Sequence, residues 1–582
     1  MPAESGANGG ARLAEAIAGL GVRTLFTLCG GHISPLLVGA RRAGLRVVDV
    51  RDEAAAVFAA DAAARLSGTV GVAAVTAGPG VTNALTALQN ARLAQSPVLL
   101  IGGAAPTVLR GRGALQDIDQ LSVVRPHVKW AASARRVRDL GPLCARAAAV
   151  AHDGVPGPVF LDCALDLLYD EDVVREWYGA AGAAAGRSLR ARLEGWYLRR
   201  HVDRMFARAG EGRGPPRRPP VTAGPDGRLV GRARELLAAA RRPLLLIGSQ
   251  AVLDVGRVDR LAAAVAALGI PTYLSGMARG LLGRRHEVLR RHRRREALRE
   301  ADVVILAGVP CDFRLDYGRH LGRGARVVAA NLSRAEARRN RRPTVTAVGD
   351  PGAFVTALGS APPDPGAWAP WAAELAARDA AREAAIAAMA TAPGDHVHPI
   401  ALCRAVEDAA AADSVFVLDG GDFAATASYV LSPRGPLRHL DPGVFGTLGV
   451  GGGFALGAAA VRPGAEIWVL YGDGAAGFSL AEVDTCVRHG IPVIAVVGND
   501  ASWAQIARDQ VAVLGDDVGT VLRRTDYHLV ARGFGGEGLL VERAGDLPAA
   551  LATAQDVART GRPVLVNVLL DRTDFRKGSI AM

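Results

Sequence analysis

Cysteine is scarce in this sequence of 582 residues, and the six cysteines stand far apart from one another. None takes part in a CxxC pair or in a cluster with histidines. Neither a disulfide framework nor a zinc site of familiar spacing is therefore indicated. A reducing compartment fits this usage, and we expect the protein to be cytoplasmic.

Long apolar runs are absent too. No stretch approaches the roughly 20 consecutive apolar residues that a membrane span needs. The N-terminal stretch MPAESGANGGARLAEAIAGLG also lacks the basic and then apolar segments of a signal peptide. We therefore expect no membrane partner.

Aromatic residues make up only 5% of the chain, whereas half of its residues are apolar. This composition is typical of compact α/β proteins and excludes disorder. The length exceeds what one hydrophobic core can serve and predicts about three or four domains. The formal net charge is +12, nearly all of its basic side from arginine. An anionic partner is expected, and charge alone leaves nucleic acid, a membrane surface and phosphorylated small molecules open.

Strand and helix patterns alternate in three segments of the chain. Short apolar runs such as VGVAAVT, ADVVILAGVP and IPVIAVVGND are separated by stretches rich in alanine and leucine. This alternation is typical of βαβ units around a parallel sheet. We predict three doubly wound parallel-sheet domains, at residues 10–185, 228–360 and 395–582.

Residues 186–227 separate the first two of these domains. The stretch GEGRGPPRRPPVTAGPDG at 210–227 is too rich in glycine and proline for a regular element and predicts a linker. An amphipathic helix is predicted before it. The residues expected on its inward face are Leu189, Leu193, Trp196, Tyr197 and Met205.

Polar residues follow two neighbouring strands near the C-terminus. Gly472-Asp473-Gly474 ends one apolar run, and Asn499-Asp500 ends the next. Ligands of doubly wound sheets bind outside the carboxyl ends of the strands, and glycine lets the backbone approach them closely. Two hard oxygen donors suit Mg²⁺ that also carries phosphate oxygens. The sequence predicts a metal-diphosphate site here.

With Leu456-Gly457, Pro463, Trp468 and Leu470 upstream, this segment resembles the signature of thiamine-diphosphate-dependent enzymes. The resemblance implies that Asp473, Asp500 and the backbone carbonyl of Ser502 bind Mg²⁺. The family has Asn-Asn where this chain has Asn499-Asp500, so a carboxylate replaces an amide. By the same resemblance, Leu448 would be the apolar residue that bends the cofactor. The other cofactor contacts implied in this segment are Gly472, Gly474, Ala475 and Asn499.

The first domain resembles the pyrimidine-binding domain of the same family. In VVDVRDEAAAVF, Glu53 matches the glutamate that holds the aminopyrimidine N1′ and so promotes loss of the thiazolium C2 proton. Gly78 and Asn83 belong to the matching GPG-TN loop and are expected to contact the cofactor. In the family, this glutamate and the metal motif come from neighbouring subunits. The resemblance therefore implies a homo-oligomer, at least a dimer and by expectation a tetramer.

Two further residues narrow the chemistry. His32 in GGHISPLL and Gln116 in GALQDIDQL stand where lyase and carboligase members such as benzaldehyde lyase have a histidine and a glutamine. Both can assist proton transfer at a substrate hydroxyl or carbonyl. The acceptor of the substrate's hydroxyl proton could be His32, Gln116 through a water, or Asp509. We favour His32.

Longer stretches, among them GMARGLLGR, CDFRLDYGR, DGGDFAATA and RTDFRKGSIAM, are similar to the acetolactate-synthase-like 2-hydroxyacyl-CoA lyases. This resemblance implies reversible cleavage of a 2-hydroxyacyl-CoA to formyl-CoA and an aldehyde or ketone. Arg279 and the basic run RRHRRRE at 290–296 are candidates for binding the phosphates of CoA.

Three alternatives stay open. They are an acetolactate synthase, a carboligase of the benzaldehyde lyase type, and a non-enzymatic binding relative. The intact Glu53, Asp473 and Asp500 argue against the last, because a binding module does not need them. We therefore expect an enzyme and no nucleic-acid partner.

Overall fold

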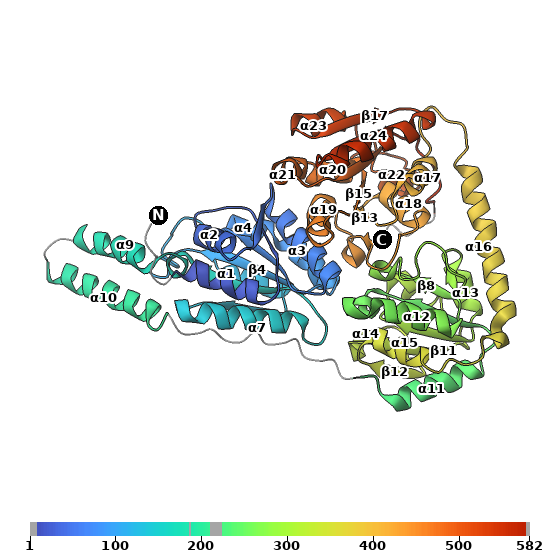
Figure 1. The fold of residues 1–582 in the computed structure, drawn as a ribbon, viewed down its shortest axis with the longest axis horizontal. Coiled ribbons are helices and arrows are strands. Elements are labelled where there is room, and N and C mark those ends of the chain that lie inside the picture. The colour runs from blue at the N-terminus through green and yellow to red at the C-terminus, as the bar shows by residue number, and fades with distance from the viewer. Residues whose placement is uncertain (1–7, 185–187, 210–223, 578–582) are drawn as a thin grey trace. The chain divides into compact units, whose positions relative to one another are not determined.

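The computed structural model describes residues 8–184, 188–209 and 224–577. It divides into two compact units, which are described separately below (Figure 1). Unit 1 comprises residues up to Pro220 except 66–68, and unit 2 comprises the remainder from Val221 together with Leu66–Gly68. Most of the predicted linker, residues 210–223, and the last five residues of the C-terminal motif lie outside the described residues.

Unit 1 contains one parallel six-stranded sheet in the order β2-β1-β3-β4-β6-β5. Its strands β3, β4 and β6 are buried along their whole length, as expected of parallel strands covered on both faces. On one face, α1 (Gly9–Gly19), α2 (Ser34–Arg42) and α7 (Leu140–His152) share a core with the sheet. The strands are β1 (Thr24–Thr27), β2 (Arg46–Asp49), β3 (Gly71–Val75), β4 (Val98–Ala104), β5 (Trp130–Ser133) and β6 (Val159–Ala164).

Unit 2 contains two more parallel six-stranded sheets, in the orders β12-β11-β10-β7-β8-β9 and β14-β13-β15-β16-β18-β17. A long helix, α16 (Ala369–Met389), leads from the first to the second (Figure 1). The central strands are β7 (Pro243–Ile247), β8 (Thr272–Leu274), β9 (Leu289–Arg290), β10 (Val303–Ala307), β11 (Arg326–Asn331) and β12 (Val345–Val348). The C-terminal strands are β13 (Val415–Leu418), β14 (His439–Leu440), β15 (Ile467–Gly472), β16 (Ile494–Asn499), β17 (Glu537–Val541) and β18 (Val564–Leu569).

The predicted fold class, three parallel doubly wound sheets, is confirmed. Each sheet reverses its strand order, and the chain supplies polar residues after the strands that flank the reversal in the N- and C-terminal sheets. Among the described helices, none has the length and the apolar composition that crossing a membrane requires.

The helix predicted before the linker exists as α10 (Leu189–Phe206), paired with α9 (Glu171–Ala184), but its orientation was predicted wrongly. Only Met205 of the five expected inward residues is buried. The exposed fractions of Leu189, Leu193, Trp196 and Tyr197 are 74%, 60%, 53% and 56%. The buried side of the helix instead carries Ala191, Val202, Met205 and Phe206. An amphipathic pattern gives the faces of a helix but does not say which face meets the domain.

Candidate active site

The predicted metal motif lies at one edge of the C-terminal sheet. Gly472 of β15 pairs with Gly498 of β16, so the two strands end side by side. Asp473 begins α20 (Asp473–Ser479) directly after β15, and Asp500 follows β16. Parallel pairing therefore brings together two segments that are far apart in sequence.

Asp473 is held by backbone groups from both segments. Its Oδ1 accepts a hydrogen bond from the Gly474 N–H at 2.9 Å, and its Oδ2 accepts one from the Ser502 N–H at 3.2 Å. The Tyr527 hydroxyl donates to the Asp473 carbonyl at 3.0 Å. The side chain is 2% exposed, so its position is set by the fold.

The two carboxylates of the motif lie in surroundings that disfavour negative charge. Burial raises the pKa of Asp473 to about 6. Burial, followed by the charges of Asp473 and Asp422, raises the pKa of Asp500 to about 7, and Arg572 offsets only part of this. A hard cation would relieve both effects. Within the described residues no three Asp, Glu, His or Cys side chains are grouped as ligands, so a bound Mg²⁺ would complete its shell with backbone, phosphate and water oxygens.

Glycine is required where this loop packs most closely. A Cβ on Gly474 would lie 2.4 Å from the indole ring of Trp503. Ala475, the next residue of α20, is buried. The Asn499 amide donates to the Thr525 carbonyl at 3.1 Å, and its Oδ1 is buried with no hydrogen-bond partner among the described residues.

Leu448 is positioned by a residue that the sequence analysis missed. Asp419, which follows β13, accepts hydrogen bonds from the Gly449 and Gly451 N–H groups at 2.9 and 2.8 Å. Burial raises the pKa of Asp419 to about 6. A Cβ on Gly420 would lie 2.1 Å from Leu448 Cδ2, so the leucine packs directly against the glycine backbone. The signal was present in VLDGG, which is a strand followed by Asp-Gly just as in the metal motif.

The segment after the metal motif is joined to helix α18 by an ion pair. Arg508 of α22 (Ala504–Leu514) contacts both carboxylate oxygens of Asp422 at 3.2 and 3.0 Å. Asp422 begins α18 (Asp422–Val430). Asp509, a candidate proton acceptor, lies on α22 and is exposed.

Glu53 occupies the corresponding edge of the sheet in unit 1. It begins α3 (Glu53–Ser67), shortly after β2, and is 7% exposed. Its Oε2 accepts a hydrogen bond from Asn83 Nδ2 at 3.0 Å. A Cβ on Gly80 would lie 3.5 Å from its Oε1, so the glycine loop packs against the carboxylate.

His32 and Gln116 flank the same loop. The Nδ1 of His32 lies 3.1 Å from the Thr76 hydroxyl, and burial lowers the pKa of His32. Gln116 has a left-handed backbone with a φ of 61°, a conformation that costs energy in a residue other than glycine. A Cβ on Gly78 would lie 2.7 Å from the Gln116 carbonyl oxygen. The structure thus brings the candidate residues of unit 1 to the ends of neighbouring strands.

A buried amide that the sequence analysis also missed holds this loop. Gln120 is 4% exposed, and its Oε1 accepts a hydrogen bond from the Gly78 N–H at 2.7 Å. Its Nε2 donates to Asp162 Oδ1 at 2.7 Å and to the Gly103 carbonyl at 3.0 Å. Gln120 lies in the stretch GALQDIDQL that was quoted for Gln116, but its role depends on hydrogen-bond partners outside that stretch and could not be predicted from it.

The arginines predicted to bind CoA gather around a pocket of unit 2, although not all of them are available. The guanidinium groups of Arg290 and Arg291 donate to backbone carbonyls, such as that of Ala372 at 2.8 Å. Arg279 donates to the carbonyl and the hydroxyl of Ser428, and Arg294 donates to one backbone carbonyl at 3.1 Å. Burial, and then the charges of Arg279 and Arg314, lower the pKa of Arg294 to about 10. The pocket is lined by residues of the central and C-terminal domains, including Tyr273, Arg279, Arg284, Arg294, His320 and Ser428.

Comparison with known proteins finds three family models, one for each of the three sheet-containing domains. Residues 7–123, 230–358 and 419–568 match the family models of the N-terminal TPP binding, central and C-terminal TPP binding domains of thiamine pyrophosphate enzymes. The chain is 51% identical to the 2-hydroxyacyl-CoA lyase 2 of Bos taurus and 50% identical to that of Homo sapiens, over 99% of this chain and 92% of each relative. It is 33% identical to an acetolactate synthase large subunit of Mycobacterium tuberculosis, over 97% of this chain and 95% of the relative.

Proposed function

Because this chain belongs to the thiamine pyrophosphate enzyme family, we propose that it is a thiamine-diphosphate-dependent 2-hydroxyacyl-CoA lyase. It would cleave a 2-hydroxyacyl-CoA reversibly to formyl-CoA and an aldehyde or ketone. The observation that carries this proposal is the similarity, over nearly the whole chain, to proteins named 2-hydroxyacyl-CoA lyase 2. The residues that would carry out the carbon-carbon lyase reaction are those at the carboxyl edges of the C-terminal sheet and of the sheet in unit 1.

Mg²⁺ and the cofactor's diphosphate fit the edge of the C-terminal sheet. Asp473 and Asp500 would supply carboxylate oxygens and Ser502 its carbonyl, while Asp473 is already oriented by two backbone N–H groups. Leu448, fixed against Gly420, would support the bent form of the cofactor. Bound thiamine diphosphate supplies a nucleophilic carbon and an electron sink for the bond that breaks.

Proton transfer would be divided between Glu53 and His32. The Glu53 carboxyl, oriented by Asn83, would hold a proton at the aminopyrimidine N1′. His32 would take the proton of the substrate's 2-hydroxyl as the C–C bond breaks, because burial lowers its pKa and keeps the imidazole neutral and able to accept. Gln116 would hydrogen-bond the substrate oxygen.

The arginine pocket of unit 2 would bind the phosphates of CoA. Arg279 and Arg294 repel each other in a buried setting, and the charge of Asp312 does not prevent the pKa of Arg294 from falling. A phosphate would neutralise them both. The same pocket includes Ser428 at the end of α18, the helix that begins with Asp422.

We also propose that the protein is a homo-oligomer and that it is located in the cytoplasm. Helix α22 directly follows the metal motif, yet it has no buried residue in the described chain. Its Ile506, Val513 and Leu514 are 51%, 79% and 73% exposed. A second copy of the chain would cover these side chains, in agreement with a dimer or a tetramer.

The deciding experiment is a product assay with the purified chain, thiamine diphosphate and Mg²⁺. Incubation with 2-hydroxyacyl-CoA substrates of several chain lengths should release formyl-CoA and the matching aldehyde. Pyruvate is the competing donor, because the similarity to acetolactate synthase favours that enzyme as the second candidate. Acetolactate formed from pyruvate, without cleavage of any 2-hydroxyacyl-CoA, would overturn the proposal.

A further inference from the structure

Helices α9 and α10 form a hairpin of unit 1 that exposes an apolar face without a described partner. Leu189, Leu193, Trp196 and Tyr197 are spaced three or four residues apart, so they share one side of α10. Ala191 and Val202, which are buried, fall on a different side of α10 by the same spacing. Four large side chains more than half exposed on one helix face mark an interaction surface, because single exposed apolar residues are common and clusters are not.

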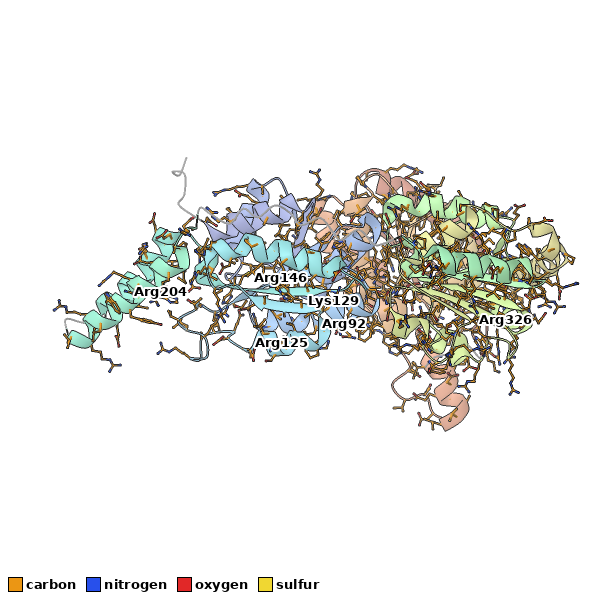
Figure 2. The ribbon with its side chains drawn as sticks, turned by 90° about the horizontal axis from the view of Figure 1, so that it is seen from below. Arg92, Arg125, Lys129, Arg146, Arg204 and Arg326 are labelled. Atoms are coloured by element: carbon orange, nitrogen blue, oxygen red, sulfur yellow. The ribbon has the colours of Figure 1, made fainter. Side chains whose placement is uncertain are left out.

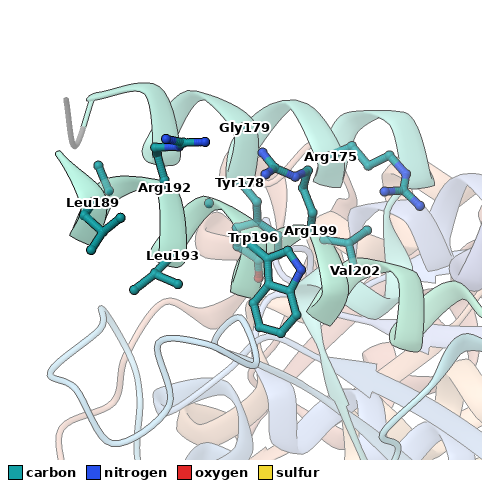
Figure 3. Close-up of a pocket in the computed structure, with 11 residues that line it drawn as sticks. Arg175, Tyr178, Gly179, Leu189, Arg192, Leu193, Trp196, Arg199 and Val202 are labelled. Carbon is teal, nitrogen blue, oxygen red and sulfur yellow. The ribbon is translucent and has the colours of Figure 1, made fainter. Parts of the chain in front are cut away.

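The same helix is strongly basic. It carries five arginines against Glu194 and Asp203. Figure 3 shows Arg175, Arg192 and Arg199 bordering the groove between α9 and α10, with Leu193 and Trp196 close by. The guanidinium of Arg200 lies 5.4 Å from the centre of the Trp196 ring. Within the described residues, no carboxylate forms an ion pair with Arg192, Arg199 or Arg200.

The positive charge continues beyond the hairpin. Arg204 lies one helical turn after Arg200 on the apolar side of α10, and Figure 2 shows it on the same side of unit 1 as Arg92, Arg125, Lys129 and Arg146. All five side chains are exposed. This side of unit 1 therefore combines a broad basic area with one apolar helix face.

The positive charge of α10 favours an anionic partner for this face over a second copy of the chain. A second copy would most simply meet it through a twofold axis, which sets the same patch against itself. Arg192, Arg199 and Arg200 would then face their own equivalents without carboxylates to separate them. An anionic surface that also accepts apolar side chains would both compensate the arginine charges and cover the exposed apolar side chains. A helix that carries arginine beside leucine and tryptophan is suited to lie in the plane of such a surface.

We propose that the α9–α10 hairpin docks unit 1 onto anionic phospholipid membranes. Leu189, Leu193 and Trp196 insert at the level of the headgroups, and the arginines of α10 contact lipid phosphates. Trp196 suits this depth because its ring is apolar and its N–H remains hydrogen-bonded. This peripheral docking differs from the expectation of no membrane partner, which rested on the absence of spanning segments.

Co-sedimentation of the full chain with lipid vesicles tests the proposal. We expect binding to vesicles of phosphatidylcholine with phosphatidylglycerol, weaker binding at high salt, and little binding to phosphatidylcholine alone. Replacing Arg192 and Arg199 with glutamine should lower the partition coefficient roughly 30-fold, about fivefold for each arginine. The double change Leu193→Ser and Trp196→Ser should abolish binding. The matched controls, Arg326→Gln for charge and Val348→Ser for an exposed apolar side chain, lie in unit 2 and should bind like the unaltered chain.

A second readout separates insertion from other causes of sedimentation. Brominated lipids should quench tryptophan fluorescence of the bound chain, and Trp196→Phe should remove much of that quenching while binding persists. Failure to bind anionic vesicles at low salt, or equal binding by the Leu193→Ser and Trp196→Ser variant, would overturn the proposal. Loss of oligomer mass in that variant, measured by light scattering without vesicles, would instead make this face a contact between copies. Lyase activity in solution should be unchanged in every variant, so the docking test does not depend on the proposed reaction.

Discussion

At the scale of single residues, the carboxylates of Glu53, Asp473 and Asp500 lie in different surroundings, and we propose different roles for them. Under the proposed function, Glu53, which accepts a hydrogen bond from one amide, would exchange a proton with the cofactor, whereas Asp473 and Asp500, whose pKa values are raised by burial, would bind a cation as carboxylates. This division predicts two separable losses of function, one of proton chemistry and one of cofactor binding.

Glu53→Gln should retain the fold and the metal site, because the substitution keeps the shape of the side chain and removes only its proton exchange. Turnover should fall by at least about 10²-fold, the usual effect of losing a positioned acid-base group. Exchange of the cofactor's C2 proton for deuterium, followed by NMR after acid quench, should slow in parallel. Exchange at the unaltered rate would show that Glu53 is not the activating residue.

Asp473→Ala should abolish Mg²⁺-dependent binding of thiamine diphosphate, because it removes a hard anionic ligand and leaves the diphosphate charge uncompensated. Titration calorimetry with and without Mg²⁺ measures this directly. Asp500→Asn is the informative partner variant, since it restores the amide found in related enzymes and should bind the cofactor nearly as well. Equal affinity in Asp473→Ala and the unaltered chain would contradict the metal assignment.

Arg294→Gln should raise the KM for a 2-hydroxyacyl-CoA about tenfold, as expected for a lost charged hydrogen bond, with little change in kcat. A 2-hydroxyacyl thioester of N-acetylcysteamine lacks the nucleotide, so its KM should be the same in both proteins. Arg299→Gln is the control, because Arg299 lies on the same helix, α13 (Arg294–Glu300), and does not line the pocket. An equal rise of KM for both substrates would exclude phosphate binding by Arg294.

At the scale of elements, one carboxylate of α16, that of Glu383, contacts both the central and the C-terminal domain. Glu383 lies 2.7 Å from His292 Nε2 and 2.8 Å from Arg404 NH2. The hydrogen bond from His292, and next the charge of Arg291, lower the pKa of Glu383 to about 2 from its ordinary value of 4.5. A lowered pKa in the folded chain stabilises it above about pH 4.5, and this contribution disappears as the pH falls toward 2.

Glu383→Gln should therefore lower the Tm at neutral pH by a few degrees. The difference from the unaltered chain should shrink as the pH is lowered through that range, which thermal unfolding at several pH values will measure. Glu374→Gln is the matched control on α16, because Glu374 forms an exposed i,i+4 pair with Arg378 that contributes little. A Tm difference that does not change with pH would mean that Glu383 acts through packing and not through charge.

The sequence predicted correctly those strands and sheets that a local pattern of residues defines. The segments Gly-Asp-Gly, Asn-Asp and Gly-Pro-Gly each follow a strand that the sequence predicted, and the parallel pairing of the strands places them at the carboxyl edges of their sheets. It failed for α10, because periodicity defines an apolar face without saying whether a domain covers it. It missed Asp419 although VLDGG shows the same strand and Asp-Gly pattern as the metal motif. It missed Gln120 because that amide acts through hydrogen bonds to residues 17 and 42 positions away in the sequence.

At the scale of the whole molecule, the candidate residues are divided between the two units. Glu53, His32 and Gln116 belong to unit 1, whereas Asp473, Asp500 and Leu448 belong to unit 2. Our proposal of a homo-oligomer takes Glu53 and the metal motif of each working site from different subunits. The two losses of function predicted above should then complement each other.

Co-expression of the Glu53→Gln and Asp473→Ala chains tests this arrangement. Each variant alone is expected to be nearly inactive. In a dimer that contains one of each, one site combines both defects and the other combines an intact Glu53 with an intact Asp473. Random pairing makes half of the dimers mixed, so about a quarter of the unaltered activity should return. Activity should also follow the mixed species when the two chains carry different affinity tags. If the purified mixed dimer stays as inactive as its parents, each site is built within one chain, and the subunit-sharing arrangement is wrong.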